Sequence, residues 1–96
     1  MALKKKIIQW NGIPTEYHRI YNIENIVNHG TVIKVYSYIN ENEREREKEK
    51  PIYSIRTEDI YLAVDEIELP YNDTLTVDDA YEYLKTLEKY SDAEDI

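Results

Sequence analysis

Hydrophobic and polar residues alternate on both sides of Asn11-Gly12, in the segment "KKIIQWNGIPTEYHRI". Alternation with a period of two is typical of an antiparallel strand pair with one buried face. Asn and Gly both tolerate a positive φ, which a two-residue type I′ turn requires. The segment therefore predicts an amino-terminal hairpin. In its expected register one face carries Ile8, Trp10, Ile13 and Tyr17, and the other carries Ile7, Gln9, Glu16 and His18.

The pattern after this hairpin predicts further strands. Ile20, Ile23 and Ile26 recur at every third position, which a bulged strand or a strand ending near Ile23 would both explain. Residues 28–30 predict a turn. Residues 31–40 are rich in β-branched and aromatic residues, which favours a strand. Its two faces would carry Ile33, Val35 and Ile39 on one side and Lys34, Tyr36 and Tyr38 on the other.

Residues 40–50 read "NENEREREKEK" and contain no apolar side chain. A strand would separate the acids from the bases, whereas a helix would pair Glu41 with Arg44 and Glu43 with Arg46. Neither form is expected to bury anything, and about ten residues alone make a marginal helix in water. We therefore predict a long, solvated, mobile connection that includes a nascent helical turn, with a partner-docking arm as the alternative.

Residues 52–56 predict another strand. Residues 57–69 fit either a helix with Ile60, Val64 and Ile67 on its face or a strand with Ile60, Leu62 and Val64 inward and a kink near Asp65. We favour the strand, which Pro70 would end.

The clearest helix signal lies near the carboxyl end. Thr76 is a suitable N-cap, with Asp79 three residues later in a variant of the capping box. One apolar face follows at helical spacing, comprising Val77, Ala80, Tyr81, Leu84 and Leu87. The helix is expected to run from about residue 77 to 89, and residues 91–96 to fray as an acidic tail.

These elements predict an α+β fold. Residues 1–90 would form one domain, a small antiparallel β-meander of about four strands that begins with the hairpin. One amphipathic helix needs an apolar surface to cover, so we expect the carboxyl-terminal helix to pack on the sheet.

Charge changes the picture because it is unevenly distributed. The net charge is −8, with +3 over residues 1–40, −1 over residues 41–50 and −10 over residues 51–96. Such an acidic half argues against nucleic acid as a direct partner. There is no Cys, no apolar run of membrane-spanning length and no apolar segment typical of a signal peptide. We therefore expect a protein of the cytoplasm without membrane contact.

Candidate chemistry is sparse. His18 and His29 have no metal-ligand spacing, and the acids around Asp73, Asp78 and Asp79 lack the spacing of a calcium loop. With two Gly in the chain, no phosphate-cradling loop is expected. We predict a protein that is not an enzyme and has no cofactor and no metal. Ten of the eleven aromatic residues are Tyr, which suits contact surfaces, and we single out Tyr36, Tyr38, Tyr83 and Tyr90 as contact residues.

Four segments carry a resemblance to a known family: "NGIPTEYHRI", "IKVYSY", "EREREKEK" and "LPYNDTLTVDDAYEYLKTLEKY". Together they resemble a family of short bacteriophage and prophage proteins, encoded among the tail and baseplate genes of phages of low-G+C Gram-positive bacteria. No enzymatic activity comes with this resemblance. It implies a tail-assembly or virion-associated role, other tail or baseplate proteins as partners, and a location in the host cytoplasm during assembly.

Other functions stay open at this stage. An acidic host-takeover protein could use residues 51–96 as a DNA mimic to occupy a basic host protein. A small-ligand-binding or enzymatic domain would need a deep pocket lined by Tyr and His18. Self-association is a further alternative, because small sheets expose unpaired edges.

Overall fold

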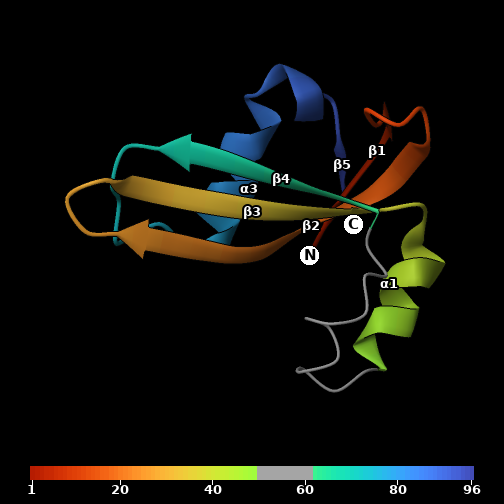
Figure 1. The fold of residues 1–96 in the computed structure, drawn as a ribbon, viewed down its shortest axis with the longest axis horizontal. Coiled ribbons are helices and arrows are strands. Elements are labelled where there is room, and N and C mark those ends of the chain that lie inside the picture. The colour runs from red at the N-terminus through yellow and green to blue at the C-terminus, as the bar shows by residue number, and fades with distance from the viewer. Residues whose placement is uncertain (50–61) are drawn as a thin grey trace.

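The computed structural model describes residues 1–49 and 62–96 (Figure 1). The described residues form one antiparallel sheet in the order β4-β3-β2-β1-β5, with two α-helices and a short 3₁₀ helix. The α+β class and the antiparallel meander are confirmed, with five strands instead of about four. The bounds are β1 (Leu3–Ile8), β2 (Pro14–Ile26), β3 (Gly30–Tyr38), α1 (Glu41–Lys48), β4 (Ala63–Leu69), α3 (Val77–Lys85), η1 (Glu88–Tyr90) and β5 (Glu94–Asp95).

The hairpin of β1 and β2 exists, but its turn and register differ from the prediction. The Gln9 amide donates to the Ile13 carbonyl at 3.1 Å, so the loop holds three residues, with Gly12 at φ 81°. This loop needs a positive φ only at Gly12, whereas a type I′ turn needs one at Asn11 as well. Ile8 consequently lies opposite Pro14, one residue away from the expected register.

A slip of one residue exchanges the two faces of a strand. Ile8, Trp10 and Ile13 of the predicted face are exposed in the structure, whereas Tyr17, predicted on the same face, is buried in the cluster with Ala2 and Tyr38. The expected opposite face supplies buried Gln9 and His18 instead.

β2 continues through Ile26 and carries an irregularity between Ile20 and Asn22, which confirms the bulged-strand alternative. The predicted turn follows, with Asn28 at φ 60°. At Gly30 a Cβ atom would lie 3.0 Å from the Leu69 carbonyl oxygen, so glycine permits the close approach of β4. Gly30 thus allows β4 to pair closely with the start of β3 beside this turn.

β4 follows the strand alternative for the part of residues 57–69 that the structure describes. Its facing is the reverse of the predicted one, because Val64 points outward while Ala63, Ile67 and Leu69 are half-buried. β4 pairs with β3 from Ala63 to Leu69 without a shift in register, so there is no kink at Asp65. The predicted strand at 52–56 lies outside the described residues.

The carboxyl-terminal helix is shorter than predicted, and the residues that follow it form more regular structure than predicted. Thr76 caps α3 by accepting the Asp79 amide at 3.1 Å, as expected. α3 ends at Lys85, and η1 then buries Tyr90. Residues 94–95 form β5, and Ala2 and Ile96 exchange two backbone hydrogen bonds of 2.9 Å. The prediction of a frayed tail is therefore wrong for residues 94–96.

The two helices contact different faces of the sheet. Ala80, Tyr81 and Leu84 of α3 pack with Leu3, Ile20, Ile33 and Val35 in the main core. Tyr17 and Tyr38 point to the other face and form a smaller cluster with Ala2. α1 begins three residues after Tyr38 and lies at this end of the sheet (Figure 1).

Candidate interaction surfaces

The structure does not bring the four predicted Tyr contact residues together. Tyr38 and Tyr90 are fully buried, so neither offers the ring surface that a contact role requires. Tyr83 is half-buried and packs against the main core. Tyr36 is half-buried and stacks on Tyr21 with ring centroids 4.3 Å apart. The prediction is wrong for Tyr38 and Tyr90 and stays a prediction for Tyr36 and Tyr83.

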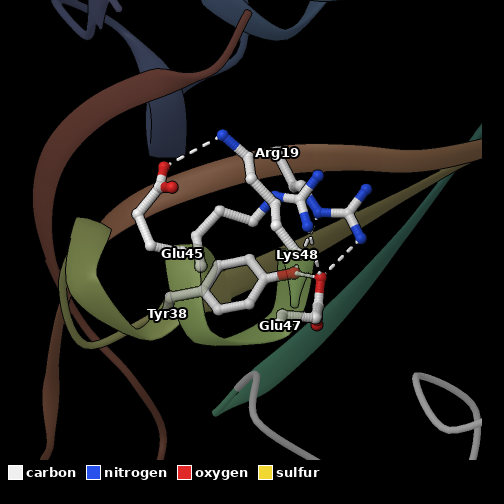
Figure 2. Close-up of polar contacts among 6 residues, drawn as sticks. Arg19, Tyr38, Glu45, Glu47 and Lys48 are labelled. Carbon is white, nitrogen blue, oxygen red and sulfur yellow. Dashed lines mark hydrogen bonds and ion pairs between the residues drawn. The ribbon is translucent and has the colours of Figure 1, made fainter. Parts of the chain in front are cut away.

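Tyr38 instead belongs to a buried polar cluster with α1 (Figure 2). Its hydroxyl donates to Glu47 Oε1 at 2.6 Å and accepts from Arg19 Nε at 2.9 Å. The same Glu47 oxygen accepts from Arg19 Nη2 at 2.7 Å and from Arg44 Nη1 at 3.0 Å. Three charge-assisted or short hydrogen bonds thus converge on one atom and fix α1 to the sheet.

The electrostatics of this cluster follow from its burial. Burial opposes the Arg19 charge, but hydrogen bonds with Tyr38 and Glu47 outweigh it and raise the pKa of Arg19. Burial, and then the bond to Glu47, raise the pKa of Tyr38. Glu47 Oε2 is buried and accepts no hydrogen bond from residues 1–49 or 62–96. The cluster is therefore a structural anchor in which Tyr38 is neutral and Arg19 is charged.

The sequence analysis missed this cluster, because it expected residues 40–50 to bury nothing. That expectation is wrong: Glu47 is fully buried. The other helix pairs, Arg46 with Glu43 and Lys48 with Glu45, are exposed ion pairs at i,i+3. Because charges alternate along residues 43–50, each Glu there has similar sequence neighbours. Glu47 differs from the others only in lying next to Tyr38 and Arg19 in the fold, which the sequence pattern does not reveal.

A second buried polar site surrounds His18 on the face that α3 covers. His18 Nδ1 lies 2.8 Å from Ser37 Oγ, and Nε2 lies 2.7 Å from the Lys5 carbonyl oxygen. The Tyr90 ring packs edge-on at 5.7 Å. Burial lowers the pKa of His18, so the neutral ring donates through Nε2 and accepts through Nδ1. Both nitrogens are occupied by structural bonds.

Two groups of exposed apolar residues lie at opposite ends of the molecule, while Met1, Ile39, Val64, Val77 and Ile96 are exposed outside these groups. Ile8, Trp10 and Ile13 form the hairpin patch, in which Trp10 is 90% exposed and Ile8 is 60% exposed. Ile26, Val27 and Tyr71 form the turn patch, in which Val27 is 73% exposed. The Asn72 amide donates to Thr31 Oγ1, which places the segment after β4 beside the start of β3. In Figure 1 the β1–β2 loop and the β2–β3 turn lie at opposite ends of the long axis.

One pocket of about 280 Å³ lies beside the start of α1. Lys4, Glu16 and Glu41 line it together with Asn40, Asn42 and Tyr17. Its lining mixes both signs of charge and is predominantly polar, unlike the apolar pockets that usually bind small ligands. His18 is not among its lining residues.

Other site types were sought in residues 1–49 and 62–96. These residues contain no group of three or more His, Asp or Glu side chains that could hold a metal ion. Within the same ranges, no helix has the length and apolar character to cross a bilayer. Comparisons with protein-family models, curated proteins and solved structures found no match.

Proposed function

We propose that this chain is a structural or assembly protein of a phage tail, which acts through protein–protein contact and not through catalysis. Its partners would be other tail or baseplate proteins, met in the host cytoplasm during assembly. The phage assignment comes from the sequence resemblance. The contact role is supported by one structural observation, the exposed Trp10 at the tip of the hairpin.

Exposed Trp10 supports a contact role because the hairpin fixes the loop backbone that presents it. The Gly12 amide donates to the Gln9 carbonyl at 2.9 Å, and the Ile13 amide donates to Asn11 Oδ1 at 3.2 Å. Below the loop, Gln9 Nε2 donates to Thr15 Oγ1 at 2.9 Å. The loop backbone that carries Trp10 is fixed in this way, so binding would order only its side chain, and Trp is enriched among residues that dominate interface energies.

A binding experiment with the other tail proteins tests this function. The tagged chain and its Trp10→Ala variant would be co-expressed with tail and baseplate proteins, and bound proteins identified after purification. We expect the wild type to retain a tail protein and Trp10→Ala to lose it. Val64→Ala is the matched control, since Val64 is 44% exposed but lies in β4, outside both patches.

Gene deletion gives the second test. If tails assemble normally without the gene and mass spectrometry finds no copy in purified virions, a tail role is excluded. Retention of the same tail protein by Trp10→Ala would instead exclude the hairpin as its contact surface.

The acidic host-takeover protein is the second candidate. Asp73, Asp78 and Asp79 are exposed near the start of α3, and none has an ion pair within the described ranges. Other carboxylates do not favour it, because Glu66 is paired with Lys34, and Glu82 and Asp95 with Lys85. A pull-down from host lysate in moderate salt that returns a nucleic-acid-binding protein, and no tail protein, would favour this candidate.

A further inference from the structure

Asn11 and Gly12 form the peptide in which a backbone nitrogen meets the least obstruction beside an Asn side chain. The chain contains seven Asn residues, and only Asn11 precedes a glycine. Glycine has no Cβ, so its backbone can approach a neighbouring group closely. The residues after the other six Asn all carry side chains that hinder such an approach: Ile23, Ile26, His29, Glu41, Glu43 and Asp73. The Asn11 side chain is therefore the one most open to attack by the nitrogen that follows it.

The hairpin loop holds the Asn11 side chain along the backbone. Its Oδ1 accepts the Ile13 amide at 3.2 Å, which is a bond to the residue two positions later. Such an Asx turn lays the side-chain carbonyl over the peptide that joins Asn11 to Gly12. The Ile13 N–H also donates to the oxygen on which negative charge develops when Cγ is attacked. The side-chain amide is thus directed toward the Gly12 nitrogen and is activated.

One hydrogen bond opposes an attack by the Gly12 nitrogen. The Gly12 amide donates to the Gln9 carbonyl at 2.9 Å, and this bond must open before the nitrogen loses its proton. Residues 10–13 are all exposed, so opening the loop uncovers no buried apolar side chain. Local openings of this kind cost much less free energy than global unfolding. The loop can therefore react while the sheet below it stays folded.

We infer that Asn11 is a site of spontaneous deamidation in which the Gly12 nitrogen is the nucleophile. This nitrogen forms a bond to Asn11 Cγ, and the bond between Cγ and Nδ2 breaks. The proton lost by the Gly12 nitrogen leaves with Nδ2 as part of ammonia, and a cyclic imide remains. Water then opens the ring at either carbonyl, which gives aspartate or isoaspartate. The net reaction consumes one water, releases one ammonia and needs no oxidant or reductant.

Both products change the hairpin patch. A carboxylate is ionised at neutral pH, so either product places a negative charge beside Trp10. In isoaspartate the main chain also runs through the former side chain, which lengthens the loop by one carbon atom and prevents it from keeping its present geometry. The modified chain is therefore expected to lose the contact that Trp10 makes. This consequence rests on the proposed function, whereas the reaction at Asn11 does not.

Ageing of the folded chain tests the inference. The purified protein would be incubated at physiological temperature, at neutral and at mildly alkaline pH. Mass spectrometry of its peptides, with fragmentation that separates isoaspartate from aspartate, would follow each Asn over time. We expect Asn11 to react roughly tenfold or more faster than Asn28. The rate should rise with pH, because the attacking nitrogen must lose a proton.

Two controls accompany this measurement. Asn28 is the matched internal control, because it is also exposed in a turn and has a positive φ, but it precedes His29. Asn11→Gln keeps an amide that lies one carbon farther from the backbone, and position 11 should then stay unmodified over the same period. Equal rates at Asn11 and Asn28 would overturn the inference, because the glycine would then have no effect.

A free peptide of residues 9–15 gives the reference rate for an open loop. A rate in the folded chain within roughly tenfold of this reference would support local opening of the loop. If Asn11 stays intact in the folded chain after the free peptide has fully reacted, the bond between Gly12 and Gln9 blocks the nitrogen and the inference is wrong.

Binding by aged protein separates this inference from the proposed function. Asn11→Asp carries one product from the start and, like the aged wild type, should lose the tail protein. Fresh and aged Asn11→Gln should bind it alike. Retention of the tail protein by fully deamidated wild type would overturn the effect on contact. If fresh wild type binds no tail protein while Asn11 still reacts, only the proposed function fails.

Discussion

Glu47 is the residue on which α1 depends. Its Oε1 accepts bonds from Arg19, Tyr38 and Arg44, while its Oε2 is buried with no hydrogen-bond partner in the part of the chain that the structure describes. Two cations and one anion in a buried cluster are stable only while the anion is present, since an uncompensated buried charge costs several kcal/mol. The carboxylate charge therefore contributes more to stability than the other acids of the same helix.

Glu47→Gln should lower the free energy of unfolding by about 3 kcal/mol, because it keeps the shape of the side chain but removes the charge that balances Arg19 and Arg44. Urea denaturation with an unchanged m-value would measure the loss. Glu45→Gln is the control, because the Glu45–Lys48 pair at 2.9 Å is exposed (Figure 2). Its removal should cost at most about 0.5 kcal/mol. Equal losses for the two variants would contradict the anchor role of Glu47.

His18 makes stability depend on pH. Burial lowers the pKa of His18 below 6.5, so the folded state keeps the ring neutral while the unfolded state takes up a proton first. The unfolded state then binds more protons, and stability should fall as the pH drops below about 6.5, by up to about 1.4 kcal/mol per pH unit. Above that pH the stability contributed by the neutral ring is fully present.

Unfolding free energies measured between about pH 5 and 8 would check this slope. In His18→Gln the part of the slope that belongs to the imidazole should disappear, whatever the absolute stability of the variant. A variant with the same slope as the wild type would show that other groups cause the acid sensitivity.

At the scale of elements, the sequence predicted strands and caps better than their facing. The Thr76 cap, the turn near Asn28 and the burial of Ile33 and Val35 in β3 follow from local chemistry, and all are present. Ile39, predicted on the same face, is exposed instead, and Tyr38, predicted on the opposite face, is buried. The hairpin register does not follow, because Asn11-Gly12 fits a two-residue turn and a three-residue turn equally well. α1 was missed for a related reason, since its recorded contacts with the sheet are hydrogen bonds of the buried Glu47 carboxylate and not the packing of apolar side chains.

The start of α1 is set by Asn40. Its side chain accepts the Glu43 amide at 3.2 Å, and Glu41 and Glu43 stand in the first turn near the positive end of the helix dipole. Asn40→Ala should destabilise the protein by about 1 kcal/mol, because it removes the N-cap bond. Asn42→Ala, a control in the exposed first turn, should change stability by less than about 0.5 kcal/mol. Thermal unfolding of both variants would separate them, and equal melting temperatures would argue against the cap.

At the scale of the whole molecule, the chain closes by joining its two ends. β5 pairs with β1, and Lys5 Nζ donates to the Ser91 carbonyl at 2.6 Å. Local patterns could not predict this closure, because residues 91–96 are polar and acidic and their partner strand lies about ninety residues earlier. What holds the segment is buried Tyr90, whose hydroxyl donates to Asp65 at 3.0 Å and so positions the chain for its return to β1.

Deleting residues 94–96 should therefore lower stability by about 2 kcal/mol, because the two bonds between Ala2 and Ile96 and the cover over the β1 edge are lost. For a domain of this size, such a loss lowers the melting temperature by on the order of 10 °C. The double substitution Glu94→Gln and Asp95→Asn is the control, since it removes the charges and the 2.9 Å contact between Lys85 and Asp95 but keeps the backbone pairing. Hydrogen exchange at the Ala2 and Lys4 amides should accelerate in the deletion and not in the control. An unchanged exchange rate in the deletion would mean that β5 adds nothing to the sheet, and that the β1 edge is protected by η1 alone.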